Sequence, residues 1–218
     1  MSLVSSRFRL GPSGLVCLPR FASGMRIGLY GGSFNPAHAG HRHVSLMALR
    51  RLGLDRVWWI VTPGNPLKDT GELAPTAARV EEARQIARHP AIDVTAFEEE
   101  IGARYTVDTL AYLKRRCPGV RFVWIMGADN LAGFNRWRGW RSIARMMPMA
   151  VVDRPGWTLR AVHSRAAINL AQDRIPESEA RSLAGLAPPA WVFLHGPRSF
   201  LSSTAIRHLR RTSPPMRR

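Results

Sequence analysis

Short apolar runs alternate along the chain with stretches in which apolar residues return every three or four positions. The apolar runs predict buried strands over 26–30, 57–62, 92–96, 121–126, 149–152 and 191–194. The three-to-four spacing predicts helices over about 40–52, 76–88, 106–116, 137–146, 159–171 and 203–210. We expect a loop over 172–190, which holds Gly185 and three prolines. Regular alternation of strand and helix predicts an α/β fold with a doubly wound, mostly parallel sheet and helices on both faces.

Length and composition favour one domain with two short flanking segments. The chain of 218 residues can bury one core, which we place at residues 25–212. Residues 1–24 contain arginines, no acid, and Gly, Ser and Pro, so we expect a disordered N-terminal extension. An upstream start codon or an organellar transit peptide is the alternative explanation for this segment. Residues 213–218 are expected to be a basic tail.

Neither the apolar runs nor the cysteines suggest a membrane or an oxidising compartment. No apolar run approaches the roughly 20 residues that a membrane-spanning helix needs, so we expect no membrane partner. Cys17 and Cys117 have no metal-ligand spacing and suggest no disulfide framework. A cytoplasmic location is therefore predicted.

The formal net charge of +17 is unusual and would suit a polyanionic partner. Lys68 and Lys114 are the only lysines, and the arginines are scattered along the chain. Such a bias is typical of a GC-rich genome, and the chain carries no recognisable motif that reads nucleic acid. We therefore expect no nucleic-acid partner, although a basic nucleic-acid-binding protein remains the alternative from another functional class.

The most informative stretch lies where the first predicted strand passes into the first predicted helix. Gly31 and Gly32 follow the strand, and His38 and His41 stand three residues apart at the start of the helix. Glycines let backbone N–H groups approach a phosphate closely, and residues three apart on a helix share one side. In open α/β sheets ligands bind outside the carboxyl ends of the strands, beside helix N-termini. The stretch therefore predicts chemistry on phosphate.

Several motifs in order carry a resemblance to a known family. Residues 31–41 resemble the signature of nucleotidyltransferases with a His-x-Gly-His motif, and residues 202–207 resemble the second signature of that superfamily. Between them, residues 63–68, 105–109 and 127–130, followed by Trp137, resemble the bacterial nicotinate mononucleotide adenylyltransferases. The resemblance runs from about Met25 to Arg210 and implies a Rossmann-like fold.

The resemblance implies adenylyl transfer from ATP to nicotinate mononucleotide, which gives deamido-NAD and pyrophosphate in NAD biosynthesis. Nicotinamide mononucleotide or another phosphorylated acceptor is the alternative on the same fold. An acceptor phosphate is already anionic at pH 7, so the enzyme must mainly align two polyanions and stabilise developing charge. No protein cage for a metal is evident, and we expect Mg²⁺ to arrive with ATP. The oligomeric state is left open.

The resemblance also assigns roles to individual residues. It implies that His38, His41 and Arg207 act on the ATP phosphates. ATP contacts are expected from Gly31, Gly32, Ser33, Phe34, Ser202, Ser203 and Thr204. Contacts to the acceptor are expected from Lys68, Tyr105, Thr106, Asp129 and Trp137.

Each assignment has a structural alternative in the residues themselves. Ser203 or Thr204 can simply cap a helix, in which case Arg207, one turn further on, would be solvated. Trp137 and Trp140 fall on the predicted helix 137–146. The resemblance implies that Trp137 stacks on the pyridine ring; the alternative is that the pair fixes the helix to the sheet, and we expect this structural role for Trp140. Asn35 departs from the superfamily, which often has Asp there; asparagine can still accept a hydrogen bond in the turn.

Overall fold

A computed structural model describes residues 18–64, 73–196, 203, 206 and 207, and its framework is one six-stranded parallel sheet. The strands are β1 (Arg26–Gly32), β2 (Arg56–Val61), β3 (Ile92–Thr95), β4 (Arg121–Gly127), β5 (Met149–Val152) and β6 (Trp191–Leu194). They lie in the order β3-β2-β1-β4-β5-β6, and every neighbouring pair is parallel. The α/β, Rossmann-like prediction is confirmed, with each strand within two residues of its expected bounds.

The order of the strands creates a switch point beside β1. From β1 the chain proceeds outward to β2 and β3, then returns to the other side of β1 for β4, β5 and β6. The neighbouring helices diverge at such a point, and the carboxyl ends of the strands there border a crevice that binds ligands in this class of fold. The segments that follow β1 and β4 are therefore the first place to look for a site.

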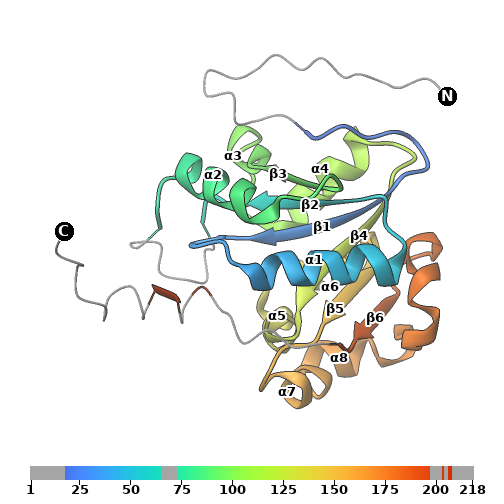
Figure 1. Ribbon diagram of the computed structural model, residues 1–218. Coiled ribbons are helices and arrows are strands. Elements are labelled where there is room, and N and C mark those ends of the chain that lie inside the picture. The colour runs from blue at the N-terminus through green and yellow to red at the C-terminus, as the bar shows by residue number, and fades with distance from the viewer. Residues whose placement is uncertain (1–17, 65–72, 197–202, 204–205, 208–218) are drawn as a thin grey trace.

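Helices cover both faces of the sheet (Figure 1). The α-helices are α1 (Ala39–Leu52), α2 (Thr76–Ala87), α3 (Phe97–Glu100), α4 (Thr106–Arg116), α5 (Ala128–Gly133), α6 (Trp140–Met146), α7 (Thr158–Val162) and α8 (Arg165–Asn169). The 3₁₀ segments are η1 (Phe134–Arg136), η2 (Ala171–Asp173) and η3 (Glu177–Gly185). No helix in the described ranges is long and apolar enough to cross a membrane.

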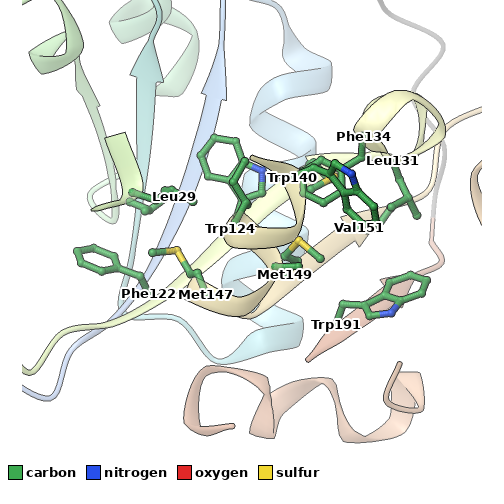
Figure 2. Packing of buried hydrophobic residues seen from close by; sticks show 14 of the residues in the cluster. Leu29, Phe122, Trp124, Leu131, Phe134, Trp140, Met147, Met149, Val151 and Trp191 are labelled. Carbon is green, nitrogen blue, oxygen red and sulfur yellow. The ribbon is translucent and has the colours of Figure 1, made fainter. Parts of the chain in front are cut away.

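Side chains alternate between the two faces of the sheet along each strand, and this divides the core into two layers. On one face α1, α2 and η3 pack against residues such as Trp59, Val61 and Val123. On the other face α4, α5 and α6 pack against Trp124, Met149 and their neighbours; Figure 2 shows part of this second layer. Both faces of the strands are buried, which is why their sequences read as continuous apolar runs.

Three predicted segments differ in detail from the structure. The helix expected over 137–146 begins at Trp140, because Gly139 adopts a left-handed backbone (φ 65°) just before it. The helix expected over 159–171 is broken near Ser164, whose hydroxyl accepts the N–H of Ala167 and starts α8. The loop expected over 172–190 contains η3, whose Ala180, Leu183 and Ala184 are buried against the sheet.

Residues 18–24 lie within the segment for which disorder was expected. Leu18 and Phe21 nevertheless pack against the core, and the Phe21 ring meets the edge of Trp58 at 6.3 Å between centroids. The Gly24 N–H donates to the Gly119 carbonyl at 2.8 Å. This part of the extension therefore covers the end of the sheet opposite the switch-point crevice. Residues 1–17 and the expected tail at 213–218 lie outside the described residues.

Candidate active site

The turn between β1 and α1 is shaped by packing as well as by glycine. Phe34 has a positive φ of 45°, which is uncommon for a residue other than glycine. Its buried ring stacks on Trp59 at 4.9 Å between centroids with planes 13° apart, and this contact holds the backbone in place. The Asn35–Pro36 bond is cis, and the Asn35 side-chain oxygen accepts the N–H of Ala74 at 3.3 Å. Asn35 thus fixes the turn through a hydrogen bond, as its side chain was expected to do.

The two histidines lie against each other at the start of α1. Their ring centroids are 3.8 Å apart. The backbone N–H of His38 donates to the ring nitrogen Nδ1 of His41 at 3.2 Å. This contact places the proton of a neutral His41 on Nε2. His38 is 4% exposed, and neither of its ring nitrogens has a hydrogen-bond partner within the described part of the chain. Buried nitrogens without partners are costly, and a bound phosphate would satisfy them.

Burial and a nearby cation keep both imidazoles neutral. Desolvation, followed by the positive charge of Arg154, lowers the pKa of His38 from 6.5 to about 4. Desolvation also lowers the pKa of His41 well below 6.5, with further contributions from His38 and Arg154. At pH 7 each ring therefore presents one N–H donor, and an arriving phosphate anion would favour protonation.

The C-terminal signature meets the histidine turn. Residues 203, 206 and 207 are helical, the Ser203 hydroxyl donates to the Pro36 carbonyl at 3.0 Å, and Nη1 of Arg207 donates to the Asn35 carbonyl. Segments about 170 positions apart in the sequence are thus joined directly beside His38. Ser202 and Thr204, the other residues expected to bind ATP here, lie outside the described residues.

A pocket of about 330 Å³ opens beside this turn, at the carboxyl ends of β1, β2 and β4. Its walls are formed by Gly31, Gly32, Ser33, Thr62, Gly64, Glu98, Arg104, Tyr105, Thr106, Trp124, Asn130, Arg136, Trp137 and Arg138. Three expected acceptor residues, Tyr105, Thr106 and Trp137, are among them. Lys68 lies outside the described residues. The pocket wall thus holds three residues expected to contact ATP, Gly31, Gly32 and Ser33, together with these three acceptor residues.

Aromatic and cationic groups give the pocket its chemical character. Trp137 follows η1, outside a helix, and its ring meets the edges of Trp124 and Phe134 at 6.3 and 5.5 Å between centroids. Trp140 instead begins α6, is buried, and packs against Phe134. The Arg138 guanidinium lies 4.6 Å from the Tyr105 ring centroid. With the arginines at 104, 136 and 138 in its wall, the pocket suits an anionic ligand that carries a flat ring.

One buried carboxyl accompanies those arginines. Glu98 is 7% exposed, and its Oε1 accepts the hydroxyl of Thr109 at 2.5 Å. Burial raises the pKa of Glu98 to about 7, although the Thr109 hydrogen bond opposes the shift. Because Glu98 is close to half protonated at neutral pH, it adds less than a full negative charge to a pocket for anions.

A buried arginine ties the loops around the pocket together. Arg79 of α2 is 1% exposed and donates to the carbonyls of Ser33 and Thr62 at 2.8 and 2.7 Å. It also donates to the Ala74 carbonyl at 2.8 Å and to the Thr76 hydroxyl at 3.1 Å. Ser33 and Thr62 directly follow β1 and β2, so Arg79 sets the separation of two pocket walls.

Asp129 and Arg154 form an ion pair at the ends of β4 and β5. Nη1 of Arg154 lies 3.1 Å from Oδ2 of Asp129. Asp129 was expected at the end of a strand as an acceptor contact; it stands in the first turn of α5 and is absent from the pocket wall. Within the described residues, no group of three His, Cys, Asp or Glu side chains is placed to hold a metal ion.

Sequence reasoning did not single out Arg79, Glu98, Arg104 or Arg154. Arg154 could have been found, because it comes two residues after a predicted strand, at the edge where ligands bind. Arg79 lies in the middle of a helix and looks like any solvated arginine. Only the three-dimensional fold shows that it is buried.

The chain is similar in sequence and fold to several known proteins. The model of the cytidylyltransferase-like family matches residues 29–209. A probable nicotinate-nucleotide adenylyltransferase of Methylorubrum extorquens is 65% identical over 183 residues, which cover 84% of this chain and 99% of that protein. A probable nicotinate-nucleotide adenylyltransferase of Mesorhizobium japonicum is 57% identical over 192 residues, which cover 88% of this chain and 98% of that protein. The solved structure of Plasmodium falciparum nicotinic acid mononucleotide adenylyltransferase complexed with NaAD has a TM-score of 0.63 at 18% identity and covers 84% of this chain and 83% of that one.

Proposed function

Because the chain belongs to the nicotinate-nucleotide adenylyltransferases, within the cytidylyltransferase-like family, we propose that the crevice beside β1 is where its two substrates meet. The protein is a nucleotidyltransferase of NAD biosynthesis that joins ATP and nicotinate mononucleotide to give nicotinate adenine dinucleotide and pyrophosphate. A phosphate oxygen of the mononucleotide bonds to the α-phosphorus of ATP, and the bond from that phosphorus to the pyrophosphate oxygen breaks. No protein nucleophile is needed, since the attacking oxygen already carries charge.

The triphosphate lies, in this proposal, between the histidine turn and the C-terminal helix. Nε2–H of His41 and a ring nitrogen of His38 donate to phosphate oxygens, and Arg207 approaches from the other segment. The observation that carries the proposal is the direct hydrogen bonding of Ser203 and Arg207 to the carbonyls of Pro36 and Asn35. Donors fixed in place before the substrate arrives stabilise developing charge without reorganisation.

The mononucleotide occupies the adjoining pocket. Trp137 offers a face for the pyridine ring, and the first N–H groups of α4, which follow Tyr105, face no partner within the helix and suit a carboxylate. Gly31 has no side chain, and a Cβ there would lie 2.6 Å from the Trp124 ring, so this glycine keeps backbone and indole in close contact. Mg²⁺ enters with ATP as part of the substrate, and a cytoplasmic location remains our expectation.

Turnover of purified protein tests the proposal. With ATP, Mg²⁺ and nicotinate mononucleotide, we expect pyrophosphate release well above that of a His38→Ala variant. Nicotinamide mononucleotide in place of the nicotinate compound should react more slowly, because it lacks the carboxylate that α4 would receive. Equal rates for wild type and His38→Ala would contradict the assignment of the site.

A further inference from the structure

Arg154 stands at the same edge of the sheet as the histidine pair, and so far only its effect on the pKa values of the histidines has been described. We infer that Arg154 is a further catalytic residue: its guanidinium contacts the triphosphate beside the two imidazoles, and Asp129 holds it in place. The inference rests on the proposed function and adds a fourth phosphate donor to His38, His41 and Arg207. Arg154 follows β5, whereas the histidines follow β1, so β4 separates the two strands.

The guanidinium is anchored and still has donors to offer. Among the described residues, Nη1 of Arg154 donates to Oδ2 of Asp129 at 3.1 Å, and the guanidinium also lies against the Tyr30 hydroxyl. A guanidinium carries five N–H donors, so several are left for phosphate oxygens. The Arg154 side chain is 21% exposed, which allows a ligand to reach it.

Asp129 supplies an independent sign of a ligand at this place. Its Oδ1 is buried and, within the described residues, accepts no hydrogen bond. A buried carboxylate oxygen without a donor is costly and is rarely left so unless a ligand or water completes it. The ion pair thus presents an unfilled acceptor and unfilled donors side by side, which suits a phosphorylated sugar.

Close packing fixes the pair against the backbone. A Cβ at Gly127 would lie 2.4 Å from Oδ1 of Asp129 and 3.1 Å from Nε of Arg154. Residue 127 therefore has no room for a side chain, and the pair rests directly on the end of β4. Such a fixed cation is the kind of group that stabilises charge on a transferring phosphoryl group.

Charges converge on the histidines in a way that favours an anion. Arg154 approaches from β5, Asp129 from α5 and Tyr30 from β1, while Arg207 binds the Asn35 carbonyl in the adjoining turn. The positive charge of Arg154 contributes to lowering the pKa of both His38 and His41. Asp129 pairs with the Arg154 guanidinium, and the neighbouring Asp153 accepts the backbone N–H of Arg154 and the Thr158 hydroxyl. A bound triphosphate would add negative charge beside His38, His41 and Arg154 and would favour protonation of the two imidazoles.

Replacing Arg154 by methionine, with Arg160→Met as a matched control, tests the inference. Arg160 is an exposed arginine on α7 whose guanidinium lies over Trp157, so the control removes the same charge away from the histidines. We expect Arg154→Met to lower kcat/KM for ATP at least ten-fold and to weaken the binding of inorganic pyrophosphate measured by calorimetry. Arg154→Lys should recover part of both losses, because it keeps the charge.

A second readout tests whether the charge of Arg154 lies beside the histidines. In Arg154→Met the pKa of His38, followed by NMR of the imidazole, should rise from about 4, since the repelling charge is gone. Arg154→Met values of kcat/KM and pyrophosphate affinity within two-fold of those of Arg160→Met would overturn the inference. Should the wild type fail to turn over nicotinate mononucleotide, the proposed function fails, whereas the pyrophosphate titrations still decide the role of Arg154.

Discussion

The Arg79 side chain holds two of the pocket walls in place, so its replacement should change both the stability of the protein and the shape of the pocket. Its buried guanidinium donates to the carbonyls of Ser33, Thr62 and Ala74 and to the Thr76 hydroxyl. Arg79→Met keeps much of the aliphatic volume but leaves three carbonyls without these donors. The substitution therefore removes hydrogen bonds while disturbing packing little.

The expected loss of stability follows from those carbonyls. A buried acceptor left without a donor costs about 1–3 kcal/mol, and because Ser33, Thr62 and Ala74 are only partly buried, water can replace part of what Arg79 donates. Removing the charge returns part of this, because no described carboxylate is hydrogen-bonded to Arg79 and its desolvation lowers its own pKa. We expect Arg79→Met to lower the free energy of unfolding by about 3 kcal/mol, which corresponds to roughly 6–12 °C in Tm for a domain of this size.

Urea unfolding and steady-state kinetics together check this prediction. Arg84→Met is the matched control, since Arg84 is exposed on the same helix. Because Ser33 and Thr62 line the pocket, Arg79→Met should also raise KM for nicotinate mononucleotide below the unfolding transition. If both variants unfold within about 0.5 kcal/mol of each other, the hydrogen bonds of Arg79 do not hold the loops and the reasoning is refuted.

Three further predictions concern the histidines, the buried carboxyl and the glycine turn. His41→Ala should lower turnover at least ten-fold, about 1.4 kcal/mol of barrier, and a near-normal rate would show that the phosphate site is misplaced. Burial raises the pKa of Glu98 from 4.5 to about 7, so the folded state retains a proton that the unfolded chain releases, and the stability contributed by this group is lost as the pH rises through that window. The free energy of unfolding of Glu98→Gln, measured in urea, should therefore rise relative to that of wild type by up to about 3 kcal/mol between pH 5 and pH 8. A difference between the two proteins that is the same at both pH values would contradict the raised pKa. Gly31→Ala should raise KM for the mononucleotide several-fold, because the new Cβ would displace Trp124. The control Gly185→Ala, whose Cβ would have no atom closer than 3.9 Å, should leave KM unchanged, and equal KM values for the two variants would contradict the close contact of Gly31 with Trp124.

Much of the architecture could be predicted from apolar periodicity alone. A parallel strand buried on both faces is a short continuous apolar run, and each of the six runs became a strand. The helix boundaries were less certain where local geometry intervenes. Gly139 delays the start of α6, and the cap at Ser164 divides α7 from α8. Neither residue stands out from the hydrophobic pattern.

The site residues that are close together in the sequence could be predicted, whereas those brought together by tertiary contacts could not. His38 and His41 are close in sequence, so their pairing was foreseeable from helical spacing. Phe34 was expected to contact ATP, but its ring is 1% exposed and stacked on Trp59, so its side chain shapes the turn. The position of Arg154 just after a predicted strand could have placed it at the edge where ligands bind, but its pairing with Asp129 depends on which strands become neighbours. The role of Arg79 depends wholly on tertiary contacts and is absent from any local pattern.

A crystal structure with a nonhydrolysable ATP analogue tests the central claim most directly. Our account predicts that phosphate oxygens lie within about 3 Å of His38, Nε2 of His41 and the Arg207 guanidinium, with the α-phosphorus facing the pocket that contains Trp137. A triphosphate bound elsewhere, with the histidine turn and the C-terminal helix untouched, would contradict it.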